Sequence, residues 1–90
     1  MNDPKFRPGN LLATPGVLAK VPNDELLAAL SRHVCGDWGN VDEHDRNENE
    51  LSLKEGFRLL SVYHTRSRVK FWIITEANRV STTVLLPEEY

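Results

Sequence analysis

The chain has little of several features that would mark a special class of protein. Its one cysteine, Cys35, cannot form an internal disulfide, so we expect a fold held together by packing, as in cytoplasmic proteins. Its apolar runs, such as residues 71–74 and 84–86, are far shorter than the roughly 20 residues of a bilayer-spanning helix. No apolar signal-peptide core follows Met1. These absences predict no membrane segment and a cytoplasmic, bacterial-type location.

The composition is that of an ordinary small globular domain. The 90 residues support one modest core, and the shares of apolar (40%) and charged (27%) residues argue against disorder. We expect a poorly ordered N-terminal arm over residues 1–10, because it is rich in proline, glycine, asparagine and charge. The remaining residues, 11–90, are predicted to form a single domain, and Leu11 and Leu12 are expected to anchor the arm.

Charges are unevenly distributed along a chain whose net charge is −2. Between residues 37 and 50, one basic residue, Arg46, stands against six acidic ones: Asp37, Asp42, Glu43, Asp45, Glu48 and Glu50. From residue 54 onward the basic side chains are Lys54, Arg58, Arg66, Arg68, Lys70 and Arg79. This split is compatible with a phosphate-binding strand side, but the basic set is small for such a surface, so an ordinary solvated surface is favoured.

Helix signals occupy the first half of the chain. Thr14 and Pro15 fit the N-cap and first position of a short helix that Pro22 must end. Asn23 offers a second N-cap. Apolar residues then follow at helical spacing and form a stripe that we expect to pack on a sheet: Leu26, Leu27, Leu30 and Val34.

The second half predicts strands. Residues 42–55 have few apolar anchors (Leu51, Leu53), so we expect a loop that becomes a short exposed helix ending at Gly56. Residues 57–64, 69–76 and 80–86 are rich in β-branched and aromatic residues and are separated by turn residues. The predicted fold is α+β, with N-terminal helices packed on a C-terminal three-stranded antiparallel β-meander. Its central strand is 69–76, and the sheet buries Phe71, Ile73 and Leu85.

Several sequence blocks lie at the ends of these elements. They are Leu12-Ala13-Thr14-Pro15-Gly16, Gly36-Asp37-Trp38-Gly39, Phe71-Trp72-Ile73-Ile74-Thr75-Glu76, Thr82-Thr83 and Leu85-Leu86-Pro87-Glu88-Glu89-Tyr90. These blocks resemble those of a small bacterial family catalogued as plasmid-related proteins. The resemblance implies a mobile-element or accessory setting and carries no mechanism. At the second turn the family is expected to have Ala-Asp-Arg-Ser, whereas this chain has residues 77–80 as Ala-Asn-Arg-Val, which gives no catalytic carboxylate there.

Two patterns that imitate metal sites lack essential ligands. His33, Cys35 and Asp37 alternate, so a helix would point them to different sides, and no second ligand pair follows. Residues 45–56 begin like a calcium loop, but the sixth position is Glu50 and the twelfth is Gly56. We therefore expect no metal and no other cofactor.

The Gly36–Gly39 turn contains the most distinctive polar residues. Trp38 between two glycines either presents its ring as a ligand platform or fills space against the sheet, and Asp37 is expected to cap backbone amides. His33, just before this turn, is either a buried hydrogen-bonded residue or a general acid–base. Since the turn ends a helix that must cross the sheet, we expect a polar cluster that brings His33 and Asp37 near Tyr63, Thr75 or Arg79.

Two functional hypotheses follow. The first is a non-enzymatic interaction module that contacts a protein partner through the acidic segment or a sheet edge. Its candidate binding residues are Asp37, Trp38, Glu43, Asp45, Glu48, Thr75 and Glu76, of which the last can also form a hairpin-end ion pair with Arg79. The second, by fold analogy with RelE-like toxins, is a metal-independent ribonuclease that cradles RNA on the sheet. Its candidate site is His33, Arg58, Tyr63, His64 and Arg79. The acidic net charge favours the first hypothesis.

Overall fold

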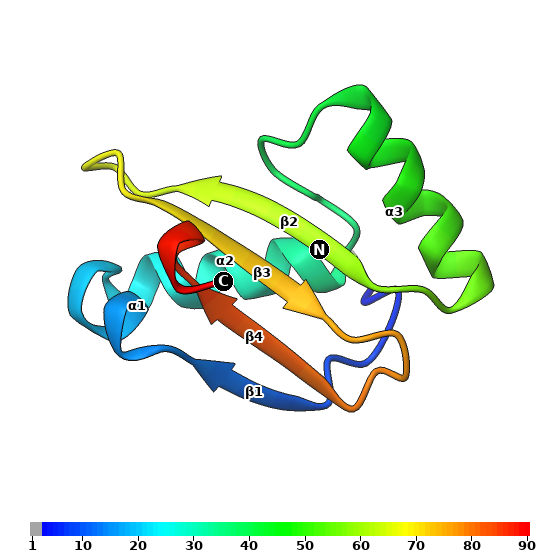
Figure 1. Ribbon diagram of the computed structural model, residues 1–90, viewed down its shortest axis with the longest axis horizontal. Helices are drawn as coiled ribbons and strands as arrows, with labels where there is room; N and C mark the ends of the chain where they lie inside the picture. The colour runs from blue at the N-terminus through cyan, green and yellow to red at the C-terminus, as the bar shows by residue number, and fades with distance from the viewer. Residues whose placement is uncertain (1–2) are drawn as a thin grey trace.

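The computed structural model describes residues 3–90, which form a four-stranded mixed sheet with helices on one face and beside one edge (Figure 1). The strand order is β1-β4-β3-β2. The elements in chain order are β1 (Asn10–Ala13), α1 (Pro15–Lys20), α2 (Asn23–Val34), α3 (Glu43–Glu55), β2 (Leu59–His64), β3 (Lys70–Thr75), β4 (Ser81–Leu85) and the 3-10 turn η1 (Pro87–Glu89). None of the helices in residues 3–90 combines the length and the hydropathy that a membrane-spanning segment requires.

The α+β class is confirmed, but the expected three-stranded meander is wrong because a fourth strand extends it. β2, β3 and β4 pair antiparallel in sequence, with β3 in the interior of the sheet as expected. β1 pairs parallel to β4 from Asn10, opposite Ser81, to Ala13, opposite Val84. A parallel pair has no tight turn to mark it, and these two strands come from opposite ends of the chain. The short run around Leu11 and Leu12 therefore carried no strand signal.

Both helices on the sheet begin near the expected places. The Thr14 side chain caps α1 by accepting a hydrogen bond from the Val17 N–H at 3.3 Å, with Pro15 in the first turn, as predicted. The expected cap of α2 at Asn23 is wrong: Asn23 is the first helical residue, and Pro22 precedes it without a side-chain cap bond. One residue separates the two assignments, within the usual uncertainty of helix ends.

Of the predicted apolar stripe on α2, only Leu26 is buried, while Leu30 and Val34 are partly buried. Leu26, Ala29 and His33 are buried, whereas Leu27 is 64% exposed. Neighbouring residues of an α-helix point about 100° apart, so Leu26 and Leu27 cannot both face the sheet. The inward positions repeat at spacings of three and four residues, and the imidazole of His33 takes the place of an aliphatic side chain.

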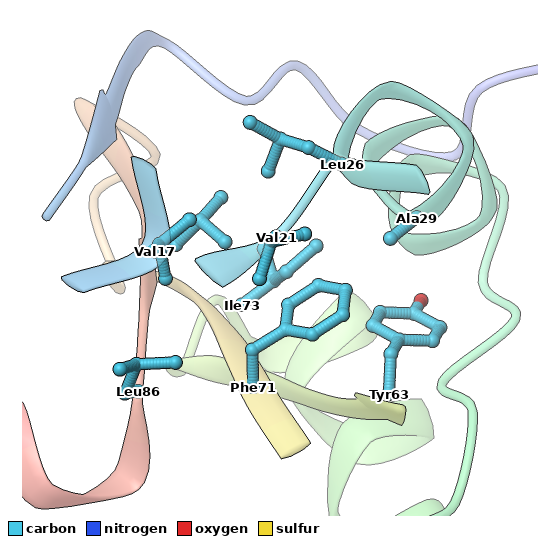
Figure 2. Close-up of a cluster of buried hydrophobic side chains, with 9 residues drawn as sticks. Val17, Val21, Leu26, Ala29, Tyr63, Phe71, Ile73 and Leu86 are labelled. Carbon is cyan, nitrogen blue, oxygen red and sulfur yellow. The ribbon is translucent and has the colours of Figure 1, made fainter. Parts of the chain in front are cut away.

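The main core lies between the sheet and helices α1 and α2 (Figure 2). Figure 2 shows the rings of Phe71 and Tyr63 side by side below α2, and their centroids are 5.8 Å apart. Phe71 and Ile73 belong to this cluster and Leu85 lies outside it, and all three are buried, as predicted. The cluster is completed by Val17, Val21, Leu26, Ala29, Val84 and Leu86. Burial of this apolar surface supplies the main driving force for folding.

Residues 43–55 are fully helical, so the expected loop followed by a short helix is wrong. The Asp42 side chain caps α3 by accepting a hydrogen bond from the Asp45 N–H at 2.8 Å, and Gly56 ends the helix with φ +78°. The residues that α3 buries are polar, Asn49 and Ser52, while Leu51 is largely exposed. The helix therefore has no apolar stripe that a hydrophobic pattern could reveal.

The outer edge of β2 is covered by side-chain and loop contacts. The Asn49 amide donates to the Leu60 carbonyl at 2.7 Å and accepts from the Leu60 N–H at 3.1 Å, so it imitates a paired strand residue. Further along, the Asn40 N–H donates to the Val62 carbonyl at 2.6 Å. Gly39 has φ +72°, and a Cβ there would collide with the Val62 carbonyl oxygen. These contacts prevent β2 from offering a free edge to another strand.

The segment before β1 packs against the domain. The first two residues of the expected arm (1–10) lie outside the described residues, and the division of the chain at residue 10 stays a prediction. The Lys5 N–H donates to the Val34 carbonyl at 2.7 Å. The Phe6 ring stacks on Trp38 with centroids 6.4 Å apart, and so joins a second apolar cluster around Trp38, Val41 and Leu59.

Replacing Asn49 by alanine should destabilise the protein by roughly 2–3 kcal/mol, because the Leu60 N–H and C=O would both lose their partner in a part-buried place. The control is Asn47→Ala on the exposed side of the same helix, which should change the free energy of unfolding by no more than about 0.5 kcal/mol. Urea denaturation of both variants measures the difference. Equal effects would contradict the assigned role of Asn49.

Candidate functional site

The His33 side chain is the centre of the most connected polar cluster in the described structure. It projects from α2 onto the sheet and is fully buried, with 0% relative exposure. Its Nδ1 atom lies 2.5 Å from the Ser61 hydroxyl of β2, and its Nε2 atom lies 2.8 Å from the Thr75 hydroxyl of β3. The predicted contact between His33 and Thr75 is confirmed, and it ties α2 to two neighbouring strands.

The cluster continues across the sheet and ends at a backbone carbonyl. The Thr75 hydroxyl lies 2.7 Å from that of Thr82 on β4, and the Thr82 hydroxyl donates to the Pro8 carbonyl at 2.7 Å. We call these residues, Ser61, His33, Thr75, Thr82 and the Pro8 carbonyl, the histidine network. It joins the N-terminal segment to α2, β2, β3 and β4.

The terminal carbonyl fixes the direction of every hydrogen bond in the histidine network. A carbonyl only accepts, so the single hydroxyl proton of Thr82 points to Pro8 and Thr82 must accept from Thr75. Thr75 must then accept from His33, which places the imidazole proton on Nε2. The bare Nδ1 accepts from Ser61. The imidazole is thus neutral, and both of its nitrogens are satisfied.

Burial and charge oppose protonation of His33. Burial lowers its pKa from the ordinary 6.5 to about 3, and the positive charge of Arg79 lowers it further in the same direction. A general acid–base works best with a pKa near the operating pH and within reach of its substrate. His33 meets neither condition, so its geometry is that of a structural histidine.

Aromatic rings close the remaining sides of His33. Phe6 and Trp38 both contact the imidazole edge-on, with centroids 5.3 Å and 5.7 Å away. Trp38 is 3% exposed, and its indole N–H donates to the Glu50 carboxylate on α3 at 2.9 Å. The Trp38 ring therefore contacts protein on both sides and offers no open platform to a ligand.

Asp37 forms a second, more exposed cluster with Arg32 and Tyr63. Its carboxylate accepts two hydrogen bonds from the Arg32 guanidinium, at 2.8 and 3.1 Å, and one from the Gly39 N–H at 3.3 Å, as expected of an amide cap. The Arg32 bonds hold the Asp37 pKa below its usual range. The Arg32 guanidinium also lies over the Tyr63 ring, 4.8 Å from its centroid.

Tyr63 is committed to this cluster. Its hydroxyl donates to the Asp37 carbonyl at 2.5 Å, and burial raises its pKa to about 12. The phenol therefore keeps its proton at neutral pH and donates it in the hydrogen bond to the Asp37 carbonyl. Its ring, 2% exposed, packs in the main core and cannot stack on a nucleic-acid base.

Arg79 donates hydrogen bonds to backbone carbonyls in two segments of the chain. Its guanidinium donates to the carbonyls of Ser52 at 2.9 Å, Phe57 at 2.7 Å and Glu76 at 3.1 Å, so it caps the end of α3 and holds the turn after β3. Burial lowers its pKa. The expected ion pair between Glu76 and Arg79 is wrong in detail, because Arg79 bonds the Glu76 carbonyl and not its carboxylate.

Arg58 and His64 lie elsewhere. Arg58 donates to the Tyr90 hydroxyl at 2.9 Å, and the Tyr90 ring packs edge-on against Trp72, on the face of the sheet opposite α2. His64, at the far end of β2, has its Nδ1 3.3 Å from the Asn40 side-chain oxygen. The five residues of the expected ribonuclease site thus do not converge on one surface.

A small cleft between α2 and the ends of β2 and β3 has a volume of about 130 Å³. It is lined by Glu25, Ala28, Ala29, Arg32, Tyr63, His64 and Phe71. Ligand pockets usually enclose about 300–1,000 Å³, so this cleft accommodates at most a side chain of a partner. Within residues 3–90, no three His, Cys, Asp or Glu side chains gather as a metal-binding group.

The polar residues that the sequence analysis missed are Ser61, Thr82 and Asn49. Ser61 lies between Leu59 and Tyr63, two residues from each, and therefore on the inward face of β2. Thr82 shares its face of β4 with Val84 in the same way. Polar residues at inward positions of strands must find buried partners, and this was the available signal. Asn49 left no comparable signal, because it belongs to a helix without an apolar face.

Comparison with protein-family models gave no match, and no similar protein was found among curated proteins or solved structures. The resemblance to plasmid-related proteins stays a prediction.

Acid should weaken the fold through His33. Between about pH 6.5 and 3 the unfolded chain binds a proton at His33 that the folded chain excludes, so stability falls as the pH falls through this window. In His33→Gln the amide keeps one donor and one acceptor and does not titrate. We expect the stability advantage of the wild type to shrink by about 1.4 kcal/mol per pH unit between pH 6 and 4.

Urea denaturation of both proteins across this range isolates the effect, because the carboxylates are common to both. A constant difference between the wild type and His33→Gln would contradict the neutral, buried state of the imidazole.

Proposed function

We propose that the protein is a non-enzymatic interaction module that binds a protein partner through the outer face of α3. The observation that carries this proposal is that α3 buries only Asn49 and Ser52 and leaves its carboxylates Glu43 and Glu48 in solvent. Asp45 is half-buried at the margin of this face. A regular helix, capped at both ends and anchored by Asn49, presents these charges at fixed spacing. The partner would carry a complementary basic surface.

The exposed carboxylates are not needed by the fold. Within residues 3–90, Glu43 makes no ion pair, and Glu48 pairs only with His44, 3.9 Å away on the same exposed side. Such a pair contributes little to stability. By contrast Glu50, on the flank of the helix, holds the Trp38 indole and belongs to the fold. The outer face of α3 therefore carries carboxylates that a partner could bind without loss of an interaction that the fold needs.

The geometry does not favour the ribonuclease alternative. His33 is sealed from solvent, Tyr63 donates its proton to the backbone and Arg79 donates to four backbone carbonyls. Each of these residues would have to leave its partners before it could touch RNA. A cytoplasmic, accessory role in a mobile element accords with the resemblance and belongs to the same proposal.

The test is a comparison of two charge-reversed proteins as affinity baits in an extract of the native host. Glu43→Lys with Glu48→Lys should abolish capture of the partner, since both lie on the outer face of α3. The matched control, Asp3→Lys with Glu88→Lys, makes the same change in net charge at exposed positions outside α3 and should capture it normally.

Both variants should unfold within about 1 kcal/mol of the wild type, so that lost capture reports recognition and not misfolding. Equal capture by all three proteins would contradict the role of α3. Cleavage of RNA by the purified wild type, lost in Arg79→Ala but not in the α3 variant, would instead support the ribonuclease.

A further inference from the structure

The two edges of the sheet differ in whether other parts of the chain cover them. At β2 the edge is covered by Asn49 and by the loop that contains Asn40, as described above. At β1 no strand, loop or side chain of the described residues pairs with the outer side, and Figure 1 shows β1 alone at that margin. An open edge is a template for another strand.

The hydrogen bonds of β1 identify the backbone groups that remain free. The Asn10 N–H donates to Val80 and the Thr14 N–H donates to Val84, at 2.8 and 3.0 Å, so these residues face β4. Backbone groups alternate in direction along a strand. Leu11 and Ala13 therefore direct their N–H and C=O groups away from the sheet.

The side chains of β1 do nothing to discourage pairing. Open edges are normally protected by charged residues, proline or a bulge, but β1 reads Asn-Leu-Leu-Ala. Leu11 is 56% and Leu12 is 53% exposed. Leu18, on helix α1, is similarly exposed at 63% but lies off the strand.

We propose that β1 pairs with β1 of a second copy of this chain, antiparallel about a two-fold axis at Leu12, so that the two sheets become one. In this register Leu11 of one copy lies opposite Ala13 of the other. These are the residues with free backbone groups, and each symmetric pair exchanges both of its hydrogen bonds. The two Leu12 side chains meet on the axis.

Charge complementarity favours a second copy over another partner. Antiparallel pairing brings the start of one β1, preceded by Arg7, toward the end of the other, where η1, which follows β4, contacts Thr14 and Gly16. There Glu89 is fixed by the Thr14 hydroxyl at 2.5 Å and the Gly16 N–H at 3.0 Å, with the exposed Glu88 beside it. Arg7 and Glu88 make no ion pair within residues 3–90. The two-fold axis repeats this opposition of charges on both sides.

The interface is a single short pair of strands, so it buries little surface and the dimer is weak. We expect a dissociation constant on the order of 10–100 µM. α3 lies at the opposite edge of the sheet, beside β2 (Figure 1). The inference therefore stands independently of the proposed function, and loss of one does not entail loss of the other.

Sedimentation velocity over about a hundredfold range of concentration tests the dimer. The wild type should shift from monomer to dimer. Leu11→Pro removes an outward N–H and leaves the bonds to β4 intact, and Leu12→Lys places like charges together on the axis; both should remain monomeric. Leu18→Lys, an equally exposed leucine off the strand, should dimerise within about twofold of the wild type. Circular dichroism verifies that each variant folds.

A disulfide trap tests the register. In a Cys35→Ser background, Leu12→Cys should oxidise rapidly to a covalent dimer, because opposed Cα atoms of such a pair lie about 4.5 Å apart, within disulfide range. Leu18→Cys is the control and should cross-link at least tenfold more slowly. A wild type that stays monomeric throughout, a dimer that survives Leu12→Lys, or equal cross-linking at both positions would each overturn the proposal.

Discussion

The fold depends on the placement of one buried, neutral imidazole. His33 stands where α2 would otherwise present an aliphatic side chain, and it satisfies hydroxyls from β2 and β3 at the same time. Because Ser61 and Thr75 are themselves fully buried, neither has water as an alternative partner. The network therefore fixes the rotation and position of α2 on the sheet, since a shift would orphan several polar groups together. Through Thr82 it also fixes the segment that leads into β1.

Polar side chains organise the rest of the molecule in the same way. Asn49 substitutes for a missing strand beside β2, and Arg79 gathers the carbonyls where α3 ends. Glu50 fixes the Trp38 ring that closes over His33. A domain of this size buries a limited apolar core, and these directional contacts give it a defined arrangement that apolar burial alone would not specify. They also account for most of the polar residues that would otherwise attract a catalytic interpretation, and leave the outer face of α3 and the edge at β1 as free surfaces.

The sequence predicted those strands and helix ends that depend on residues close to one another in the chain. The alternation and β-branching of residues 57–64, 69–76 and 80–86 gave the three consecutive strands within two residues, and Thr14 with Pro15 gave the start of α1. β1 escaped because its strand identity comes from a partner at the other end of the chain. α3 escaped because its inward side is polar. In the candidate site, the proximity of His33 to Thr75 followed from chain order, whereas the burial that deprives His33 of a catalytic role depends on Phe6 and Trp38.

The proton position on His33 is the most direct test of this account. A long-range ¹H–¹⁵N correlation spectrum of the imidazoles at pH 7 distinguishes the two neutral tautomers and the imidazolium, with the exposed His44 and His64 as reference signals in the same sample. The histidine network requires a neutral ring with its proton on Nε2, unchanged when the spectrum is repeated near pH 5. A proton on Nδ1, or an imidazolium at pH 5, would contradict the hydrogen-bond direction that the Pro8 carbonyl imposes and the buried state on which the fold depends.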